Sequence, residues 1–102
     1  MKKIHRNSHK NNEKHHLYII KDKIGDDVVK YGISADAIED DGLSNRVRRQ
    51  LRIYNALVGW KRFYAVIAVK GIKGRKLAEE LETHYIKMYR EKHGKNPRNN
   101  LK

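Results

Sequence analysis

The sequence contains no cysteine, and this absence excludes two ways of holding a small protein together. Disulfide bonds and thiolate metal sites both need cysteine side chains. Long apolar runs are missing too, since no stretch approaches the roughly 18 consecutive apolar residues of a membrane-spanning helix. No apolar segment typical of a secretory signal follows the N-terminus. We therefore expect a chain that neither crosses a membrane nor depends on disulfides.

Acidic residues are few compared with basic ones. The chain has 12 Asp and Glu against 24 Lys and Arg, which gives a formal net charge of +12. A field of this sign favours a polyanionic partner through phosphate contacts and the release of counterions. Nucleic acid is the first candidate partner, and an anionic membrane surface is the competing one. The charge does not distinguish DNA from RNA.

The chain divides into a short basic tail and one domain. Residues 1 to 16 carry five Lys and Arg against a single acid, Glu13, and offer almost nothing apolar to bury. Such a segment cannot offset the entropy of ordering it, so we expect a disordered basic tail. The four histidines of the tail lack regular ligand spacing, which favours a solvated segment over a metal site. Residues 17 to 102 are long enough for a single domain.

The domain begins with a predicted β-hairpin. Residues 17–20 (LYII) form a short β-rich run, and residues 28–33 (VVKYGI) form a second one after the turn signal Gly25-Asp26-Asp27. Residues 35–43 (ADAIEDDGL) are acidic and typical of a loop.

A helix, a third strand and a second helix follow. Ser44 is a good N-cap for a helix that runs to about Leu57, where Gly59 ends it. Residues 63–69 (FYAVIAV) are continuously apolar and predict a strand buried on both faces. A long helix is predicted over residues 75–92, with Gly94 and Pro97 beyond it. The pattern predicts an α+β fold in which helices flank a small three-stranded antiparallel sheet, in the order β-β-α-β-α.

Helical phase on the first helix separates ordinary residues from unusual ones. At about 100° per residue, one arc of this helix is apolar and is expected to be buried. That arc contains Val47, Leu51, Ile53, Tyr54, Leu57 and Val58. Arg46 and Gln50 share a row with Ile53 and Leu57, so we place them at the margin of the buried stripe. A guanidinium there needs a partner or a substrate, and an ion pair with a buried acid would also satisfy it.

The second helix shows the same pattern with the opposite charge. Its apolar arc contains Leu77, Ala78, Leu81, Tyr85, Met88 and Tyr89. Glu79 and Glu80 fall outside this arc, whereas Glu82 lies at its margin. Glu82 is therefore the acid that we single out, although a helix glutamate paired with a lysine would look the same in the sequence.

Taken in order, these fragments resemble the GIY-YIG nuclease domain over about residues 16 to 102. His16-Leu17-Tyr18 occupies the first motif and Lys30-Tyr31-Gly32 the second, with Ser34 as the small hydroxyl behind it. Arg46 matches the arginine of the first helix, and Glu82 matches the metal-binding glutamate of a later helix. Asn99 is our choice for the terminal asparagine, with Asn100 nearly as good.

The sequence departs from that family in three places. His16 stands where the family has its first glycine, and Lys30 stands in the second tyrosine slot. Neighbouring strand residues face opposite sides, so only one of Lys30 and Tyr31 can reach the site. We favour Lys30, with Tyr31 packing on the helix side. The loop over residues 35–43 is longer than is usual, which leaves access of the substrate open.

The resemblance implies a metal-dependent endonuclease. Glu82 would hold one Mg²⁺ or Mn²⁺ ion, a hard cation that prefers oxygen ligands. Tyr18 would be the general base, with a pKa lowered by the cations Lys30 and Arg46. Lys30 would orient the attacking water or assist Tyr18, and Arg46 would clamp the scissile phosphate. Without the other fragments, Tyr18 would simply be interpreted as a core tyrosine.

A further set of polar residues is predicted to contact the nucleic-acid backbone without reading the bases. The set consists of Arg48, Arg49, Arg52, Gln50 and Asn99, together with Lys61 and Arg62. Sequence specificity is therefore expected to be low, with DNA as the favoured substrate. Trp60 and Phe63 are interpreted as packing residues.

Two alternatives to a free-standing nuclease stay open. The first is a non-catalytic basic domain that only binds nucleic acid. The second is the same nuclease acting as a bacterial toxin module in the cytoplasm of a cell, delivered as part of a larger secreted protein. An acidic immunity protein would then cover the basic cleft. A mobile-element or repair nuclease is the other biological setting.

Overall fold

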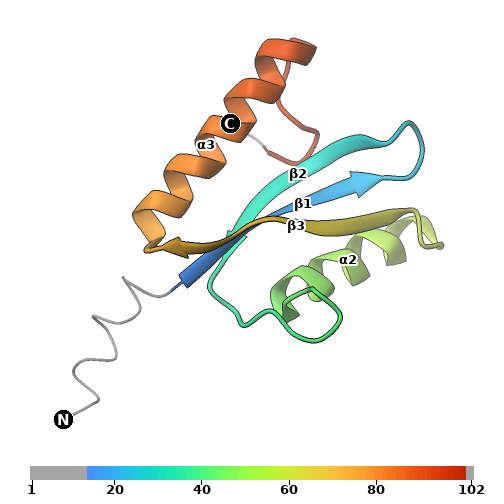
Figure 1. Ribbon diagram of the computed structural model, residues 1–102. Helices are drawn as coiled ribbons and strands as arrows, with labels where there is room; N and C mark the ends of the chain where they lie inside the picture. Colours follow the sequence, from blue (N-terminus) through green and yellow to red (C-terminus); the bar gives the residue numbers. More distant parts are fainter. Residues whose placement is uncertain (1–13, 101–102) are drawn as a thin grey trace.

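The computed structural model describes residues 14–100, which form a three-stranded sheet and two helices (Figure 1). The elements are β1 (Lys14–Asp22), β2 (Asp27–Ser34), α2 (Asn45–Val58), β3 (Phe63–Lys73) and α3 (Arg75–His93). The strand order is β2-β1-β3, and β1 pairs antiparallel with both neighbours. The predicted α+β fold and the order β-β-α-β-α are confirmed. No helix within residues 14–100 is long and apolar enough to cross a membrane.

The two helices cover opposite faces of the sheet. Side chains alternate between faces along a strand, so Leu17 and Tyr18 of β1 point in opposite directions. Leu17 belongs to a buried cluster with Ala78 and Tyr89 of α3, whereas Tyr18 belongs to a second cluster with Val47 of α2. The central strand therefore contributes to two cores, one beneath each helix. Figure 1 shows α3 and α2 on either side of the strands.

Two strands differ from the sequence prediction. β1 begins at Lys14, so His15 and His16 are buried strand residues and not part of a tail. The predicted tail over residues 1–13 lies outside the described residues. β3 is an edge strand that runs to Lys73, and its Val66 is 41% exposed. The prediction of a strand buried on both faces is wrong, because a continuous apolar run does not reveal how many neighbours a strand has.

Both helices end where the glycines predicted. Gly59 and Gly94 follow α2 and α3 in left-handed conformations, with φ of 81° and 80°. The absence of a β-carbon makes this conformation accessible, and each glycine N–H closes the last turn of its helix. Ser44 is the N-cap of α2, but its hydroxyl makes no capping bond to the helix backbone.

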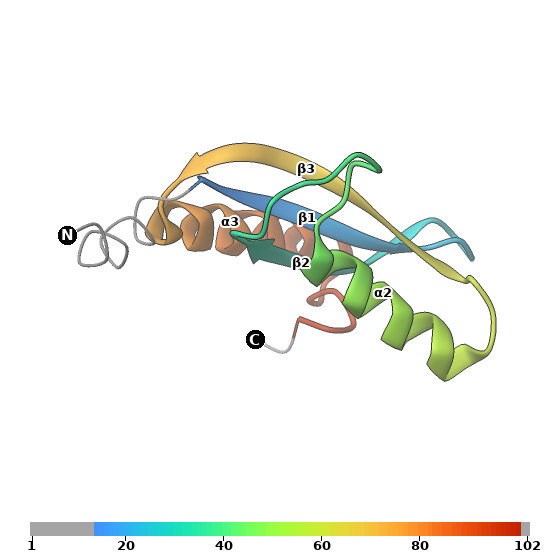
Figure 2. The same cartoon turned by 90° about the horizontal axis from the view of Figure 1, so that it is seen from below.

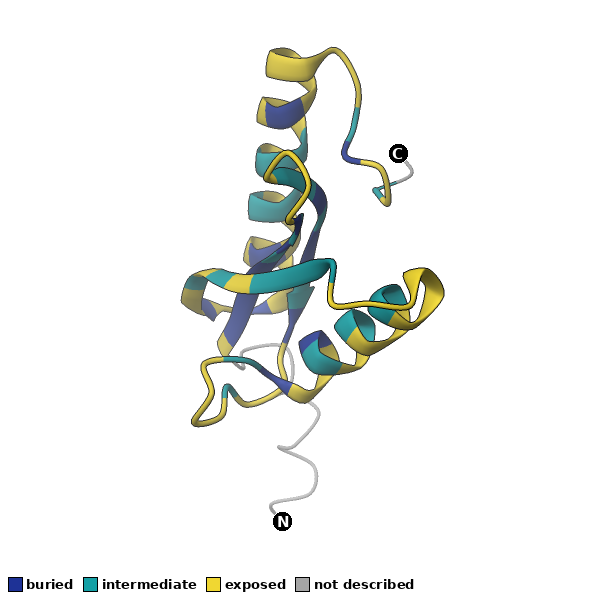
Figure 3. Cartoon of the chain, turned by 90° about the vertical axis from the view of Figure 1, so that its right-hand side faces the viewer, coloured by how far each residue is buried: buried dark blue, intermediate teal, exposed yellow. Residues whose placement is uncertain are grey.

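The predicted apolar arcs are only partly buried. Ile53 and Leu57 of α2 are 55% and 81% exposed, and Leu77 and Met88 of α3 are about half exposed. Figure 3 shows α2 coloured as buried only near its N-terminal end. A sheet of three strands is too narrow to cover the full arc of either helix. The prediction that these four side chains are buried is therefore wrong.

The C-terminal segment covers the outer edge of β2. The Asn99 N–H donates to the Val29 carbonyl at 3.0 Å. The Asn100 side chain accepts from the Tyr31 N–H at 2.9 Å and donates to the Tyr31 carbonyl at 3.0 Å. Figure 2 shows this segment beside β2. An open strand edge is a template for unwanted pairing, and this segment satisfies the edge at Val29 and Tyr31.

A buried carboxylate ties the same segment to the sheet. Asp22 is 1% exposed and accepts hydrogen bonds from the guanidiniums of Arg62 and Arg98 and from the Ile24 N–H, all at 2.7–2.9 Å. The two guanidiniums, Arg62 first, hold the pKa of Asp22 well below its usual range. Asp22 thus joins β1, the start of β3 and the chain end.

We expect Asp22→Asn to lower the free energy of unfolding by about 3 kcal/mol, because an amide leaves two guanidiniums partly unpaired beside a buried site. Since the pKa of Asp22 is depressed by folding, its stabilisation is present above about pH 4 and is lost as the pH falls further. Urea denaturation at several pH values, from about pH 3 to about pH 7, measures both effects. Asp40→Asn, in the exposed loop before α2, is the control and should leave stability nearly unchanged. Equal losses in both variants would contradict the assignment.

Candidate active cleft

A cleft of about 420 Å³ lies where β2, the start of α2 and the first half of α3 meet. The four residues predicted to be catalytic all line it: Tyr18, Lys30, Arg46 and Glu82. Ser34, Asp36, Arg75 and Glu79 contribute further polar side chains. A larger cavity of about 630 Å³ around Tyr31 and Tyr89 contains none of the predicted catalytic residues. The tertiary structure thus brings together four side chains that come from four different elements.

The register of the hairpin places two of these side chains. Tyr18 lies opposite Gly32, and Ile20 lies opposite Lys30, so Tyr18 and Lys30 face the same side as α2. The Tyr18 ring lies directly against Gly32, and a β-carbon on Gly32 would overlap the Cζ and Oη atoms of that ring. Gly32 is therefore required for the space that it leaves to the tyrosine.

Lys30 and Tyr31 separate as strand alternation predicts. Lys30 lines the cleft, whereas Tyr31 is buried in the core beneath α3. The Tyr31 ring lies 5.6 Å from the ring of Tyr85. Of the two candidates for the second motif, the structure brings Lys30 into the cleft.

Gln50 connects Tyr18 with Lys30. Its Oε1 atom accepts a hydrogen bond from the Tyr18 hydroxyl at 2.8 Å and a longer one from the Lys30 ammonium at 3.4 Å. The sequence predicted Gln50 as a nucleic-acid contact. In the structure its amide oxygen instead fixes the phenol and the amine relative to each other.

Burial moves the pKa of Tyr18 in the direction opposite to our expectation. Desolvation of the phenol raises its pKa, and the hydrogen bond and charge of Arg46 only partly oppose this effect. The prediction of a lowered pKa is wrong because it counted the nearby cations and not the burial. The pKa of Lys30 is lowered, first by burial and then by Arg46, while Glu82 opposes the shift.

Arg46 and Glu82 approach the cleft from separate helices. Arg46 is exposed, and not at a buried margin as predicted, while its backbone N–H donates to Asp36 Oδ2 at 3.1 Å. Glu82 is half-buried on α3, one turn after the ion pair between Arg75 and Glu79 at 2.8 Å. A carboxylate and a guanidinium therefore line one cleft, which can receive a cation and a phosphate together.

The donor set of the cleft suits a hard divalent cation. Within residues 14–100, no group of three or more His, Asp or Glu side chains could hold a metal ion by itself. A zinc site built from three protein ligands is not present there. Mg²⁺ needs only one or two carboxylates, because water and substrate phosphates complete its shell. Glu82, with Asp36 in the same cleft, fits that requirement.

The predicted backbone-contact residues divide into two groups. Arg49, Arg52 and Asn99 are exposed, which agrees with a role at the surface. Arg48 donates at 2.8 Å to both Glu39 and Asp41, and Arg62 is bound to Asp22. Carboxylates already bind Arg48 and Arg62, so a phosphate contact by either guanidinium stays a prediction and would have to compete with these ion pairs. Arg48 pins the acidic loop beside the start of α2.

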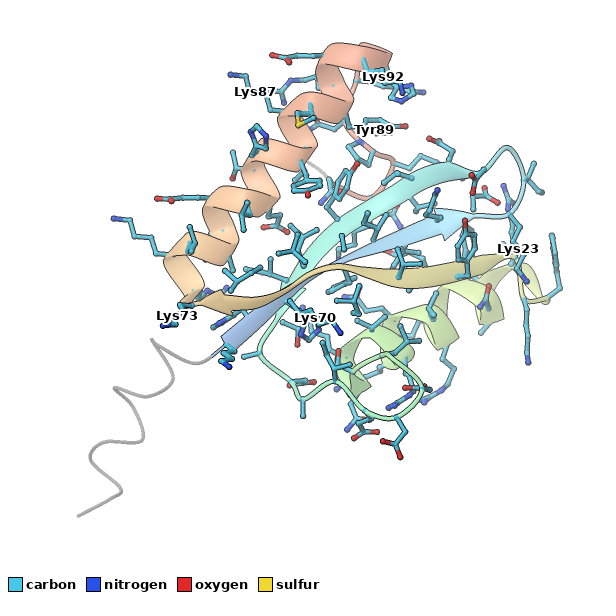
Figure 4. The ribbon with its side chains drawn as sticks, viewed as in Figure 1. Lys23, Lys70, Lys73, Lys87, Tyr89 and Lys92 are labelled. Carbon is cyan, nitrogen blue, oxygen red and sulfur yellow. The ribbon has the colours of Figure 1, made fainter. Side chains whose placement is uncertain are left out.

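Many of the lysines lie away from the cleft. Figure 4 shows Lys23 beyond the end of β1, Lys70 and Lys73 on β3, and Lys87 and Lys92 on α3. None of these lysines lines the cleft. They add to a general attraction for polyanions, whereas Arg46 and Lys30 supply the positive charge inside the cleft.

His16 connects two of the elements that form the cleft. Its Nε2 atom lies 3.0 Å from Ser44 Oγ, so β1 is joined to the N-cap of α2. From the sequence, His16 was known only as the residue at the position of the family's first glycine, and no pattern predicted this hydrogen bond. The pKa of His16 is lowered, chiefly by burial, although Asp36 opposes the effect.

Comparison with known families supplies the identity of this domain. A family model described as URI fold toxin 2 matches residues 8–94. The chain belongs to this toxin family. The match spans every described helix and strand and the four predicted catalytic residues. Comparisons with curated proteins and with solved structures found no significant match.

The family places the chain among toxin domains of the polymorphic type, one of the two alternatives that the sequence left open. Toxin domains of this type typically pair with immunity proteins. The matched description names a toxin and a fold, and it does not name a reaction. The resemblance to GIY-YIG nucleases and the catalytic roles therefore stay predictions.

The contact between Tyr18 and Gly32 can be tested by a double-mutant cycle. We expect Gly32→Ala to cost about 2 kcal/mol of stability, because the added methyl group forces the Tyr18 ring out of place. In a Tyr18→Ala background the same substitution should cost much less, since the ring is gone. Urea denaturation of the four proteins provides the measurement. Additive costs would show that Gly32 is needed for another reason.

His16 should make the fold sensitive to mild acid. An unfolded histidine takes up a proton near its ordinary pKa of 6.5, whereas the buried His16 resists it. The free energy of unfolding should therefore decrease as the pH falls from about 6.5 through the folded pKa. We expect His16→Gln to reduce this dependence on pH, whereas the control His84→Gln, at an exposed position of α3, should leave it unchanged. Thermal denaturation between about pH 5 and about pH 8, where histidine side chains titrate, provides the measurement. Identical slopes in all three proteins would refute the assignment.

Proposed function

We propose that this toxin domain is a metal-dependent endonuclease that hydrolyses phosphodiester bonds of nucleic acid, with DNA favoured and low sequence specificity. The observation that carries the proposal is the convergence of Tyr18, Lys30, Arg46 and Glu82 on one cleft. The resemblance to GIY-YIG nucleases agrees with this reaction class.

Each side chain has a role in the proposed mechanism. Arg46 presents a planar guanidinium at the cleft, which suits bidentate binding of a phosphate and its developing negative charge. Glu82 would hold Mg²⁺ or Mn²⁺, which neutralises charge on the leaving oxygen when bound. A single carboxylate would leave water and the substrate phosphate to complete the shell of the ion.

The proton of the attacking water is assigned to Tyr18. Burial raises the pKa of this phenol, so Tyr18 must first release its proton to solvent, with Arg46 and Lys30 supplying the positive charge that favours the phenolate. Water then adds to phosphorus as the bond to the leaving oxygen breaks, the water proton passes to the Tyr18 phenolate oxygen, and the leaving oxygen takes a proton from solvent. The hydrogen bonds to Gln50 hold the Tyr18 phenol and the Lys30 ammonium in place for this transfer.

The biological setting follows from the toxin family. We propose that the domain acts in the cytoplasm of a target cell, after delivery as part of a larger protein. The immunity protein that restrains it would be acidic, because the chain carries +12 and the mouth of the cleft exposes Arg46.

Glu82→Gln provides the decisive test. The native chain should cut plasmid DNA with Mg²⁺ or Mn²⁺ and lose this activity in chelator. We expect Glu82→Gln to reduce cleavage at least about 100-fold, because it removes the carboxylate that holds the metal. Binding of DNA, followed by fluorescence anisotropy, should be nearly unchanged. Glu80→Gln, on the exposed side of the same helix, is the matched control and should cut normally.

Three outcomes decide the proposal. Binding without cleavage of DNA or RNA under either metal would favour the non-catalytic alternative. Loss of both binding and cleavage in Glu82→Gln would identify Glu82 as a structural residue. Expression of the chain inside bacteria should stop growth, and Glu82→Gln should restore it if cleavage is the toxic act.

A further inference from the structure

Trp60 is the residue that the nuclease proposal leaves without a role. It is the only tryptophan of the chain, and the sequence interpreted it as a packing residue. In the structure Trp60 is 51% exposed, just after the Gly59 cap of α2. That interpretation is wrong. A half-exposed indole offers an aromatic face and an N–H group on which a ligand can stack or bond.

A row of exposed apolar side chains follows the cleft residues along α2, toward the helix end after which Trp60 lies. Ile53 and Leu57 follow Arg46 and Gln50 at helical spacing, so the four side chains share one side of α2. Gln50 reaches into the cleft at Tyr18, and this fixes the direction of the row. Ile53 and Leu57 are more than half exposed. The row therefore runs along the outside of the helix for about 17 Å from Arg46 to Leu57, at about 1.5 Å per residue.

The helix that carries this row is basic. The sequence of α2, NRVRRQLRIYNALV, contains no acidic residue. Arg49 and Arg52 are exposed on the helix, and Lys61 is exposed next to Trp60. A second copy of this chain would bring like charges together on this face, which opposes self-association. The charge fits a polyanion that also carries apolar surface.

We propose that this face, which we call the α2 track (Arg46, Arg49, Ile53, Leu57, Trp60 and Lys61), binds an unpaired stretch of the nucleic-acid substrate, with Trp60 stacking on a base. The proposal rests on the nuclease function, because the polymer held at Arg46 is the one that continues onto the track. It adds a substrate class: a strand with unpaired bases near the cut.

Stacking distinguishes single strands from duplexes. An unpaired base presents an apolar ring face beside a phosphate, and this combination matches indole and aliphatic side chains flanked by cations. In a duplex the ring faces are covered by neighbouring bases, so only phosphates remain for Arg49 and Lys61. The track is therefore expected to favour single strands, while its cations bind both forms.

The single tryptophan provides a direct readout. The full chain in chelator is titrated with a single-stranded thymidine oligonucleotide, a uridine oligonucleotide and a DNA duplex of equal length, while tryptophan fluorescence is recorded. We expect saturable quenching by the single strands and little by the duplex. In anisotropy measurements, Trp60→Ala should weaken single-strand binding about tenfold and duplex binding little, whereas Trp60→Phe should retain most of the affinity. Lys61→Ala should weaken both forms alike.

The outcomes separate this proposal from the nuclease itself. Quenching by single strands without cleavage under any metal would support binding at the α2 track and contradict the proposed nuclease activity. Cleavage with unchanged single-strand affinity in Trp60→Ala would overturn the track and leave the enzyme intact. Equal quenching by single strands and duplex would also overturn it. A dimer in solution that dissociates in Trp60→Ala would overturn the proposal and identify a second copy as the occupant of the track. Binding of an acidic protein that depends on Trp60, together with no effect of Trp60→Ala on oligonucleotide binding, would overturn it too and identify an inhibitor as the occupant.

Discussion

The pairing of Tyr18 with Gly32 is the constraint on which the cleft depends. The register between β1 and β2 sets the two residues opposite each other, and the missing β-carbon leaves room for the phenol ring. A shift of one residue in this pairing would turn Tyr18 and Lys30 to the other face of the sheet, away from Arg46. The side chain of Gln50 then joins the hairpin to α2 through Tyr18 and Lys30.

The periphery of the sheet protects this arrangement. The edge of β2 would otherwise be open beside Lys30, and the C-terminal segment satisfies it through Asn99 and Asn100. Asn99 contributes its backbone N–H to this edge and Asn100 its side chain, while the choice of Asn99 as the terminal asparagine of the family resemblance stays a prediction. Asp22 holds the same segment through Arg98. One small domain without disulfides therefore uses hydrogen bonds at its chain end to keep the strand that carries Lys30 in place.

The errors of sequence reasoning share a cause. Periodicity identified both helices and all three strands, because capping residues and apolar spacing are local signals. It failed for Ile53, Leu57 and Val66, whose exposure depends on how wide the neighbouring sheet is. It also gave no indication of the ion pairs of Arg48 and Arg62, whose carboxylate partners come from a loop and from β1. For Tyr18, the nearby cations could be predicted from the sequence, but the depth to which its phenol is buried could not, so the expected direction of its pKa shift was wrong.

The sequence by itself determined the order of the elements, the positive charge, and the separation of Lys30 from Tyr31 on opposite faces. Local chemistry suffices for these properties, since a strand alternates and a glycine ends a helix wherever they occur. Only the tertiary structure decided that Tyr18, Lys30, Arg46 and Glu82 share one cleft, that Gln50 links two of them, and that Trp60 stays exposed. These properties depend on contacts between residues distant along the chain, which arise only once both helices have packed on opposite faces of the sheet.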